Sequence, residues 1–113
     1  DAFSAHGGYD AMAAFLATGQ PCDGVFCVGD YMAFGAMHAL REAGRRIPDD
    51  VSIIGHDNVD LAKYTAPPLT TLHLPLMDMA HAAMAALVSI LTGEAEEPIQ
   101  QVFETPLIVR QST

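Results

Sequence analysis

The segment DGVFCVGDYMAFGAMHALREAGRRIPDDVSIIGHDN, residues 23–58, decides the fold expected for this chain. It begins with an apolar run, 25–28, which predicts a strand buried on both faces. Asp30 stands at the N-cap position of an amphipathic helix over 31–43. A second apolar run, 51–54, predicts the next strand. Strand, helix and strand in this order are typical of the α/β class, a parallel sheet flanked by helices, and of a Rossmann-like unit.

The same alternation extends outward in both directions. On the amino-terminal side, residues 9–18 predict a helix, and residues 1–8 predict a loop that leads into it from a strand the chain lacks. We therefore expect the chain to begin inside a truncated domain. On the carboxyl-terminal side we expect three elements: a strand at 69–72, a helix over 76–91, and a strand within 102–109, where Pro106 requires either a sheet edge or a break.

The composition and charge of the chain argue against some classes of function. The chain has 113 residues, 50% of them hydrophobic and 17% charged, which is typical of one globular domain or a part of one. A formal net charge of -9 opposes binding of this chain to duplex nucleic acid, because the phosphates carry the same sign. No apolar run approaches the roughly 18–20 residues of a transmembrane helix, so no membrane partner is expected.

Polar residues gather where the predicted strands end. In an open parallel sheet, the loops after the carboxyl ends of the strands line the ligand crevice. Four loops are expected at that edge, carrying Phe3, Gly29 with Asp30, residues 55–58, and residues 73–75. This arrangement predicts a site for a small molecule.

Each candidate residue has more than one interpretation. The carboxylate of Asp57 would accept hydrogen bonds from two hydroxyls of a polyol, sugar or nucleoside, or it would cap its own loop. Asp30 fits a helix cap better than a ligand contact. Phe3 would stack on a ligand ring or belong to the core.

Catalytic and metal chemistry find little support. The five histidines lack the spacing of a metal site, and Cys22 and Cys27 lie too far apart along extended chain for a disulfide. Neither a nucleophile elbow nor a phosphate-binding loop motif occurs, and Gly7-Gly8 is a weak anion-cradle signal that fits a turn better. We therefore predict no enzyme activity, no catalytic residue, no cofactor and no metal.

The helix over 31–43 has two apolar faces. Met32, Ala33, Ala36, Leu40 and Ala43 form a stripe for the domain's own core. A second, partly apolar face points away from that stripe; it comprises Tyr31, Phe34, Met37, His38 and Arg41. A second helix layer or a partner subunit would cover this face, and in a chain this short a partner subunit fits better.

Three ordered runs resemble one protein family. Residues 23–36 follow the pattern D-A-V-F-x-x-N-D-x-M-A-x-G-A. They are followed by IPDDVSIIGHDN at 47–58 and AKYTAPPLTTL at 62–72. Together, with their spacing kept, the runs resemble the effector-binding core of the lac-repressor and galactose-repressor family of bacterial transcription regulators.

The resemblance implies a periplasmic-binding-protein-like fold with the effector between two subdomains. Residues 1–113 would form most of the carboxyl-terminal subdomain, while the helix-turn-helix and the first subdomain lie outside this chain. The implied partners are a small effector, such as a sugar or a nucleobase-like molecule, and a second copy in a homodimer. Operator DNA would be contacted only through the missing amino-terminal part, in the cytoplasm.

Site residues are implied position by position. Phe3 and Asp57 match the aromatic and the carboxylate that contact effectors, and Asp30 lies in the same family run. Gly29 and Leu74 stand where relatives often carry Asn and Gln, so two polar contacts are lost. His56 replaces an aromatic residue, which predicts pH-dependent binding because His ordinarily changes charge near neutral pH. The implied dimer contacts are Phe34, Met37, His38, Lys63 and Tyr64.

Two alternatives remain open from the sequence. A periplasmic sugar-binding protein of a transport system shares the fold. A flavodoxin-like enzyme shares the α/β class, although no nucleophile and base pair supports it. The identity of the effector is not predicted.

Overall fold

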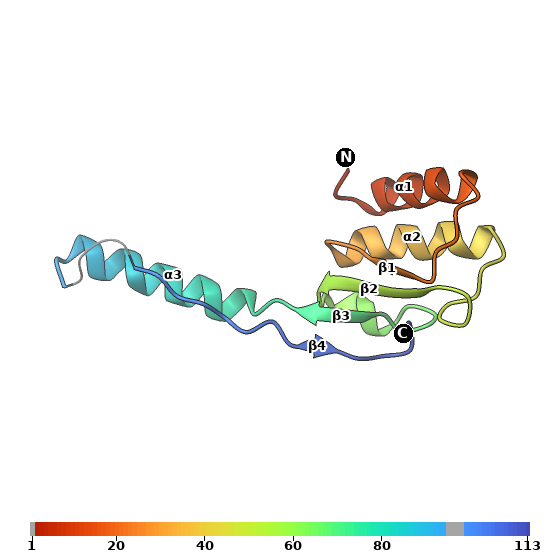
Figure 1. Ribbon diagram of the computed structural model, residues 1–113. Coiled ribbons are helices and arrows are strands. Elements are labelled where there is room, and N and C mark those ends of the chain that lie inside the picture. The colour runs from red at the N-terminus through yellow and green to blue at the C-terminus, as the bar shows by residue number, and fades with distance from the viewer. Residues whose placement is uncertain (1, 95–98) are drawn as a thin grey trace. The chain divides into compact units, whose positions relative to one another are not determined.

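The computed structural model describes residues 2–94 and 99–113. These residues divide into two compact units (Figure 1). The first unit comprises Asp1–His73 with Pro106–Thr113, and it contains the sheet. The second comprises Leu74–Thr105 and contains one helix. The predicted partial domain, residues 1–113, is thus made of two parts.

The first unit is a mixed sheet with two α-helices. Its strands lie in the order β1-β2-β3-β4; β1, β2 and β3 are parallel, and β4 runs antiparallel to β3. The predicted α/β class is confirmed, and β4 directly follows Pro106 at the sheet edge, as expected. The elements in chain order are α1 (Ala5–Ala17), β1 (Gly24–Phe26), α2 (Asp30–Glu42), β2 (Ser52–Asp57), the 3₁₀ helix η1 (Asp60–Lys63), β3 (Thr70–His73) and β4 (Leu107–Ile108).

The first helix begins earlier than predicted. Ser4 is its N-cap, and the Ser4 Oγ accepts the Gly7 N–H at 3.1 Å. The Gly8 N–H is bonded to the Ser4 carbonyl at 3.0 Å, so neither glycine offers its amide to an anion. Both the turn and the anion-cradle interpretations of Gly7-Gly8 are wrong, because both residues lie inside α1.

Close packing of α1 on α2 explains two glycines. A Cβ on Gly8 would lie 2.1 Å from the Met32 carbonyl oxygen. A Cβ on Gly35 would lie 1.7 Å from the carbonyl oxygen of Ala5. Only glycine allows the two backbones to approach so closely.

The first two strands differ from prediction at their ends. The β1 strand covers Gly24–Phe26, and the predicted burial on both faces is wrong, because Phe26 and Val28 are 57% and 54% exposed. Cys27, which lies between them, is buried, and successive residues of a strand point to opposite faces, so only one face of this segment is covered. The β2 strand runs to Asp57, past the predicted end at residue 54.

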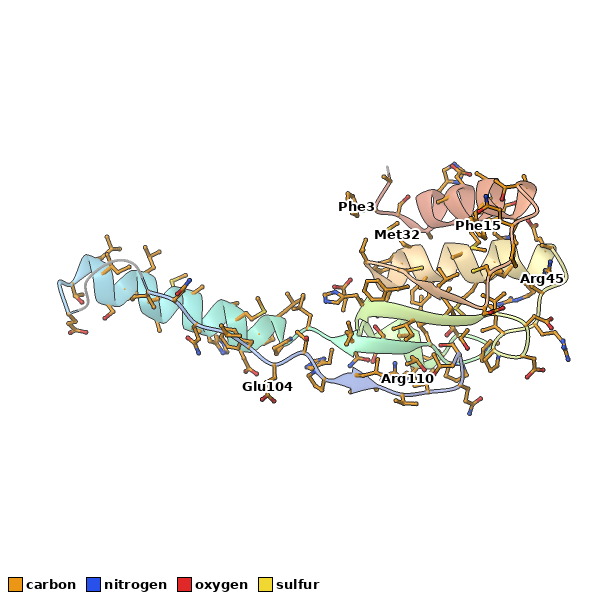
Figure 2. The ribbon with its side chains drawn as sticks, viewed as in Figure 1. Phe3, Phe15, Met32, Arg45, Glu104 and Arg110 are labelled. Carbon is orange, nitrogen blue, oxygen red and sulfur yellow. The ribbon has the colours of Figure 1, made fainter. Side chains whose placement is uncertain are left out.

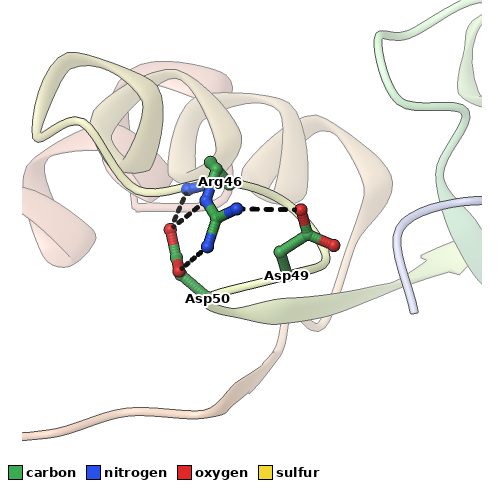
Figure 3. A network of polar contacts seen from close by, with 3 residues as sticks. All are labelled: Arg46, Asp49 and Asp50. Carbon is green, nitrogen blue, oxygen red and sulfur yellow. Dashed lines mark hydrogen bonds and ion pairs between the residues drawn. The ribbon is translucent and has the colours of Figure 1, made fainter.

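A charged turn introduces β2 (Figure 3). The Asp50 carboxylate accepts the backbone N–H of Arg46 at 2.8 Å and two guanidinium N–H groups at 2.8 and 3.1 Å. A further guanidinium N–H donates to Asp49 at 3.3 Å. The hydrogen bonds from Arg46 lower the pKa of Asp50 to about 2, and Asp50 in turn raises the pKa of Arg46.

The second unit is built on α3 (Leu76–Leu91), whose bounds match the predicted helix. Gly93, at φ 74°, follows its end, as a helix stop requires. No residue of α3 is buried. Ala82, Ala83 and Ala86 line a hollow together with Ile99 and Phe103 of the same unit. Among the described helices, none is long and apolar enough to cross a bilayer.

Candidate functional site

The parallel strands bring the predicted site residues to one edge of the first unit. Asp57 and His73 are the last residues of β2 and β3 and are register partners across the sheet. Gly29 lies after β1 as the N-cap of α2. Figure 2 shows Phe3 and Met32 at the end toward which the β2 and β3 arrows point, whereas Arg45 lies at the opposite end.

The carboxylate of Asp57 is half-buried and keeps one oxygen open. Its Oδ1 lies 3.0 Å from the Nδ1 of His56, which is also half-buried. A Cβ on Gly29 would be 3.5 Å from Oδ2, so glycine leaves open space beside that oxygen. Among the described residues, no backbone N–H donates to Asp57, so the loop-capping interpretation finds no support. The arrangement provides a carboxylate acceptor to a molecule at the sheet edge.

The backbone turns sharply where β2 ends. Asp57 has φ 111° and Asn58 has φ 57°, both in the positive region that residues with a Cβ seldom adopt. Asp and Asn tolerate it better than other such residues. Strained backbone of this kind is common at functional sites.

Asp30 has a different role from either one predicted. Its side chain is fully buried; Oδ1 accepts the Thr71 hydroxyl at 2.5 Å and Oδ2 accepts the Val59 N–H at 2.8 Å. The N-cap prediction is wrong, because Gly29 holds that position and Asp30 is the first residue of α2. As an effector contact Asp30 is also misplaced, since both oxygens bond to the protein away from solvent.

The burial of Asp30 explains why Gly55 stands within β2. A Cβ on Gly55 would lie 2.2 Å from Asp30 Oδ1 and 2.9 Å from a methyl of Leu69. The glycine predicted to open a loop is therefore a strand residue that makes room for a buried carboxylate.

A second polar chain, which the sequence did not predict, reaches the same edge. The guanidinium of Arg110 donates to Asn58 Oδ1 and to the Leu69 carbonyl, both at 2.7 Å. Asn58 Nδ2 lies 3.2 Å from Nδ1 of His73. Arg110 is 52 residues from Asn58, so only the pairing of β4 with β3 brings them together. In the sequence, the only feature that points to this polar chain is the arginine in the segment after Pro106.

The two remaining site predictions have different outcomes. Phe3 is 76% exposed, so the core interpretation of this residue is wrong, and its ring stays a predicted ligand contact. Leu74 belongs to the second unit, and its contact with an effector stays a prediction.

Two other features of the first unit do not form a site for a polar ligand: the thiol of Cys27 is not suited to catalysis, and the hollow beside β1 is apolar. Burial, together with the charge of Asp30, raises the pKa of Cys27 to about 11, which keeps this thiol protonated at neutral pH. The hollow, of ≈ 340 Å³, lies beside β1 and is lined by Ala, Gly, Val, Met, Phe and Cys residues. Residues 2–94 and 99–113 contain no cluster of three His, Cys, Asp or Glu side chains suited to a metal ion.

The predicted dimer face on α2 is only partly exposed. Met37 is 2% exposed and belongs to the core, so its predicted interface role is wrong. The reason is that α2 packs against both α1 and β2, which buries a wider arc than one stripe. Phe34 is half-buried and meets the exposed Tyr31 edge to face, with ring centroids 5.7 Å apart.

The other predicted dimer residues are on the surface. Tyr64 is 69% exposed, and the Lys63 ammonium lies 5.0 Å from its ring centroid while bonding to Asp60. His38 is exposed, pairs with Glu42 at 3.6 Å, and has its ring 5.5 Å from that of Tyr9.

Known proteins match the whole chain. The family model described as periplasmic binding protein-like domain matches residues 1–113. Two similar curated proteins are the HTH-type transcriptional regulator CelR of Thermobifida fusca, 37% identical over 110 residues, and the HTH-type transcriptional repressor PurR of Escherichia fergusonii, 41% identical over 110 residues. Each match covers 97% of this chain and 32% of the relative.

Solved structures match the fold equally well. A CelR–cellobiose complex has a TM-score of 0.94 at 37% identity, covering 98% of this chain and 34% of that one. A lac repressor dimer bound to operator and an anti-inducer has a TM-score of 0.92 at 28% identity, covering 97% of this chain and 38% of that one. The chain therefore spans about a third of the length of the proteins it matches.

Proposed function

The chain belongs to the periplasmic-binding-protein-like family of LacI-type regulators, and from this membership we propose that it is the effector-binding and dimerisation part of a bacterial transcription regulator. The observation that carries the proposal is the open Asp57 carboxylate at the shared edge of three parallel strands. The matched relatives are named as transcriptional regulators, which favours this function over a transport protein or an enzyme.

The effector we propose is a sugar or a related small polar molecule, nucleobase-like compounds included. Asp57 Oδ2 accepts a hydrogen bond from an effector hydroxyl, and a charge-assisted bond of this kind is strong. The exposed ring of Phe3 offers an aromatic surface for stacking. The CelR neighbour, solved with cellobiose, supports the sugar class.

Regulation then follows from coupling between two sites. Effector binding favours one arrangement of the regulator, and the affinity for operator DNA changes by the corresponding coupling free energy. DNA is contacted by a part of the regulator outside this chain, because the chain itself has a net charge of -9. The regulator works in the cytoplasm.

Dimerisation is assigned to the exposed face of α2 and η1. We assign to it the exposed Tyr31 and His38 of α2, the half-buried Phe34 that contacts Tyr31, and the exposed Lys63 and Tyr64 at the end of η1. Aromatic side chains are enriched at interface cores. The lac repressor neighbour is described as a dimer, which supports the assignment.

The experiment is a DNA-release assay on the regulator that contains this chain. Its operator complex is titrated with cellobiose, lactose and ribose in a gel-shift measurement. We expect one sugar to change operator affinity, and Asp57→Ala to retain operator binding while losing that response. Asp23→Ala is the matched control, because Asp23 is an exposed carboxylate just before the amino end of β1, away from the strand ends that carry Asp57. A full sugar response in Asp57→Ala would contradict the proposal.

A further inference from the structure

The hydrogen-bond chain from Arg110 to His73 has a fixed direction. A guanidinium can only donate, so Asn58 Oδ1, at 2.7 Å from Arg110, is the acceptor of that bond. The amide nitrogen of Asn58 then faces His73 Nδ1 at 3.2 Å. An amide NH₂ can only donate, so His73 Nδ1 accepts.

This direction sets the tautomer of His73. A neutral imidazole carries one proton, and Nδ1 uses its lone pair to accept from Asn58. The proton therefore lies on Nε2, which becomes a hydrogen-bond donor. Among residues 2–94 and 99–113, no side chain or backbone group bonds to that Nε2.

In His56, by contrast, Nδ1 is the hydrogen-bond donor. A carboxylate oxygen can only accept, so Nδ1 of His56 donates to Asp57 Oδ1 over their 3.0 Å contact. This bond occupies one carboxylate oxygen and leaves Oδ2 beside Gly29. Asp57 and His73 are register partners at the ends of β2 and β3. An acceptor and a donor thus end adjacent strands at the same sheet edge.

We propose that His73 is a specificity-determining residue of the effector site, with its Nε2–H donating to an effector oxygen next to the hydroxyl that Asp57 accepts. The inference rests on the proposed function, since it assumes an effector at Asp57. It names the chemistry selected: two neighbouring oxygens, one a hydroxyl donor and the other an acceptor. Adjacent hydroxyls on a sugar ring meet this requirement. Arg110 and Asn58 are positioning residues that act through His73.

The tautomer is tested without any effector. In the regulator labelled with isotopic nitrogen in histidine, two-bond nitrogen–proton spectra distinguish the two neutral forms, and His73→Gln assigns the signal. We expect the neutral form of His73 to carry its proton on Nε2. An Nδ1–H form would overturn the inference.

Two variants at position 73 separate effector contact from a structural role. His73→Asn keeps an acceptor near the position of Nδ1 and removes the donor at Nε2. His73→Gln places an amide N–H near the position of Nε2. If His73 donates to effector, calorimetry with cellobiose, lactose and ribose should show about a tenfold weaker affinity for the Asn variant and near-parent affinity for the Gln variant. His81→Asn, an exposed change on α3, is the control.

The outcomes distinguish the two proposals. If the Asn variant binds the responding sugar as the parent does, or the Gln variant alone is weakened, the specificity role is wrong even though the proposed function stands. If the parent regulator binds none of the three sugars, the sugar-sensing function fails, and the tautomer spectrum alone decides whether His73 is a donor.

Discussion

At the start of α2, the buried carboxylate of Asp30 joins three segments that are distant in sequence. It accepts from the Thr71 hydroxyl on β3 and from the Val59 N–H before η1. A charge without solvent is tolerated in a protein only when hydrogen bonds satisfy it, and here both oxygens are engaged. Asp30 therefore stabilises the site indirectly, because its hydrogen bonds hold α2 against the strands that carry Asp57 and His73.

Replacing Asp30 should destabilise the fold strongly. Asp30→Ala leaves a buried hydroxyl and a buried N–H without their acceptor, which should cost about 3 kcal/mol of the free energy of unfolding. Urea denaturation measures this change. Asp10→Ala, which removes an exposed carboxylate beside His6, should change the free energy by less than about 0.5 kcal/mol. Equal stabilities of the two variants would show that Asp30 is not a structural link.

Asp50 gives the fold an acid-sensitive turn. The hydrogen bonds from Arg46 lower its pKa from 3.8 to about 2, so the unfolded chain binds this proton more tightly than the folded chain does. The stabilisation from Asp50 is therefore complete above pH 3.8 and is lost as the pH falls toward about 2. Arg46→Gln should return the pKa of Asp50 toward 3.8.

Carboxyl titration by NMR measures the pKa of Asp50 directly. Arg45→Gln is the matched control, because Arg45 acts on Asp50 only through its charge and contributes least to lowering the pKa of Asp50. A parent Asp50 that titrates at 3.8 would show that the turn does not form in solution.

At the scale of elements, the spacing of apolar residues predicts helices well, whereas glycine residues led to wrong predictions of turns and loops. The bounds of α3 follow from its apolar spacing and from Gly93. The start of α1 was missed because Gly7-Gly8 has low helix propensity, and the need for glycine comes from a backbone on α2. Gly55 misled in the same way, since its reason is the Asp30 carboxylate. A local sequence pattern does not reveal contacts between elements that are distant in the sequence.

The site follows the same rule. Parallel topology places Asp57 and the residues after β1 and β3 at one edge, so the candidate cluster was predictable from strand ends alone. The Arg110–Asn58–His73 chain was not, because it depends on the antiparallel return of β4. The burial of Met37 was not predicted, because the second face of α2 was assigned to a partner subunit, whereas α2 packs against both α1 and β2.

The exposed face of α2 and η1 should mediate self-association. Tyr31→Glu with Tyr64→Glu places two carboxylates on that face while sparing the half-buried Phe34, so sedimentation should show the dimer dissociating. The control is Phe26→Glu, an exposed change on β1, an edge strand of the described sheet; this variant should remain dimeric. Dissociation of the Phe26 variant alone would place the contact along the sheet edge.

At the scale of the whole molecule, the role that we propose for this chain is to form one side of an effector site. It spans about a third of the regulators it matches, and its two units are Asp1–His73 with Pro106–Thr113, and Leu74–Thr105. Its acidic surface suits a regulator in which another part contacts DNA. What it contributes to the proposed sensing is the strand-end cluster around Asp57.

The measurement that tests this account most directly is the calorimetric affinity of the responding sugar for the regulator and its Asp57→Ala variant. Loss of a charged acceptor at a bound hydroxyl should weaken binding by one to two decades, about 1.5–3 kcal/mol. Asp23→Ala, which removes an exposed carboxylate before the amino end of β1, should bind as the parent does. An unchanged affinity in Asp57→Ala would contradict the account, because the effector would then bind away from the strand ends.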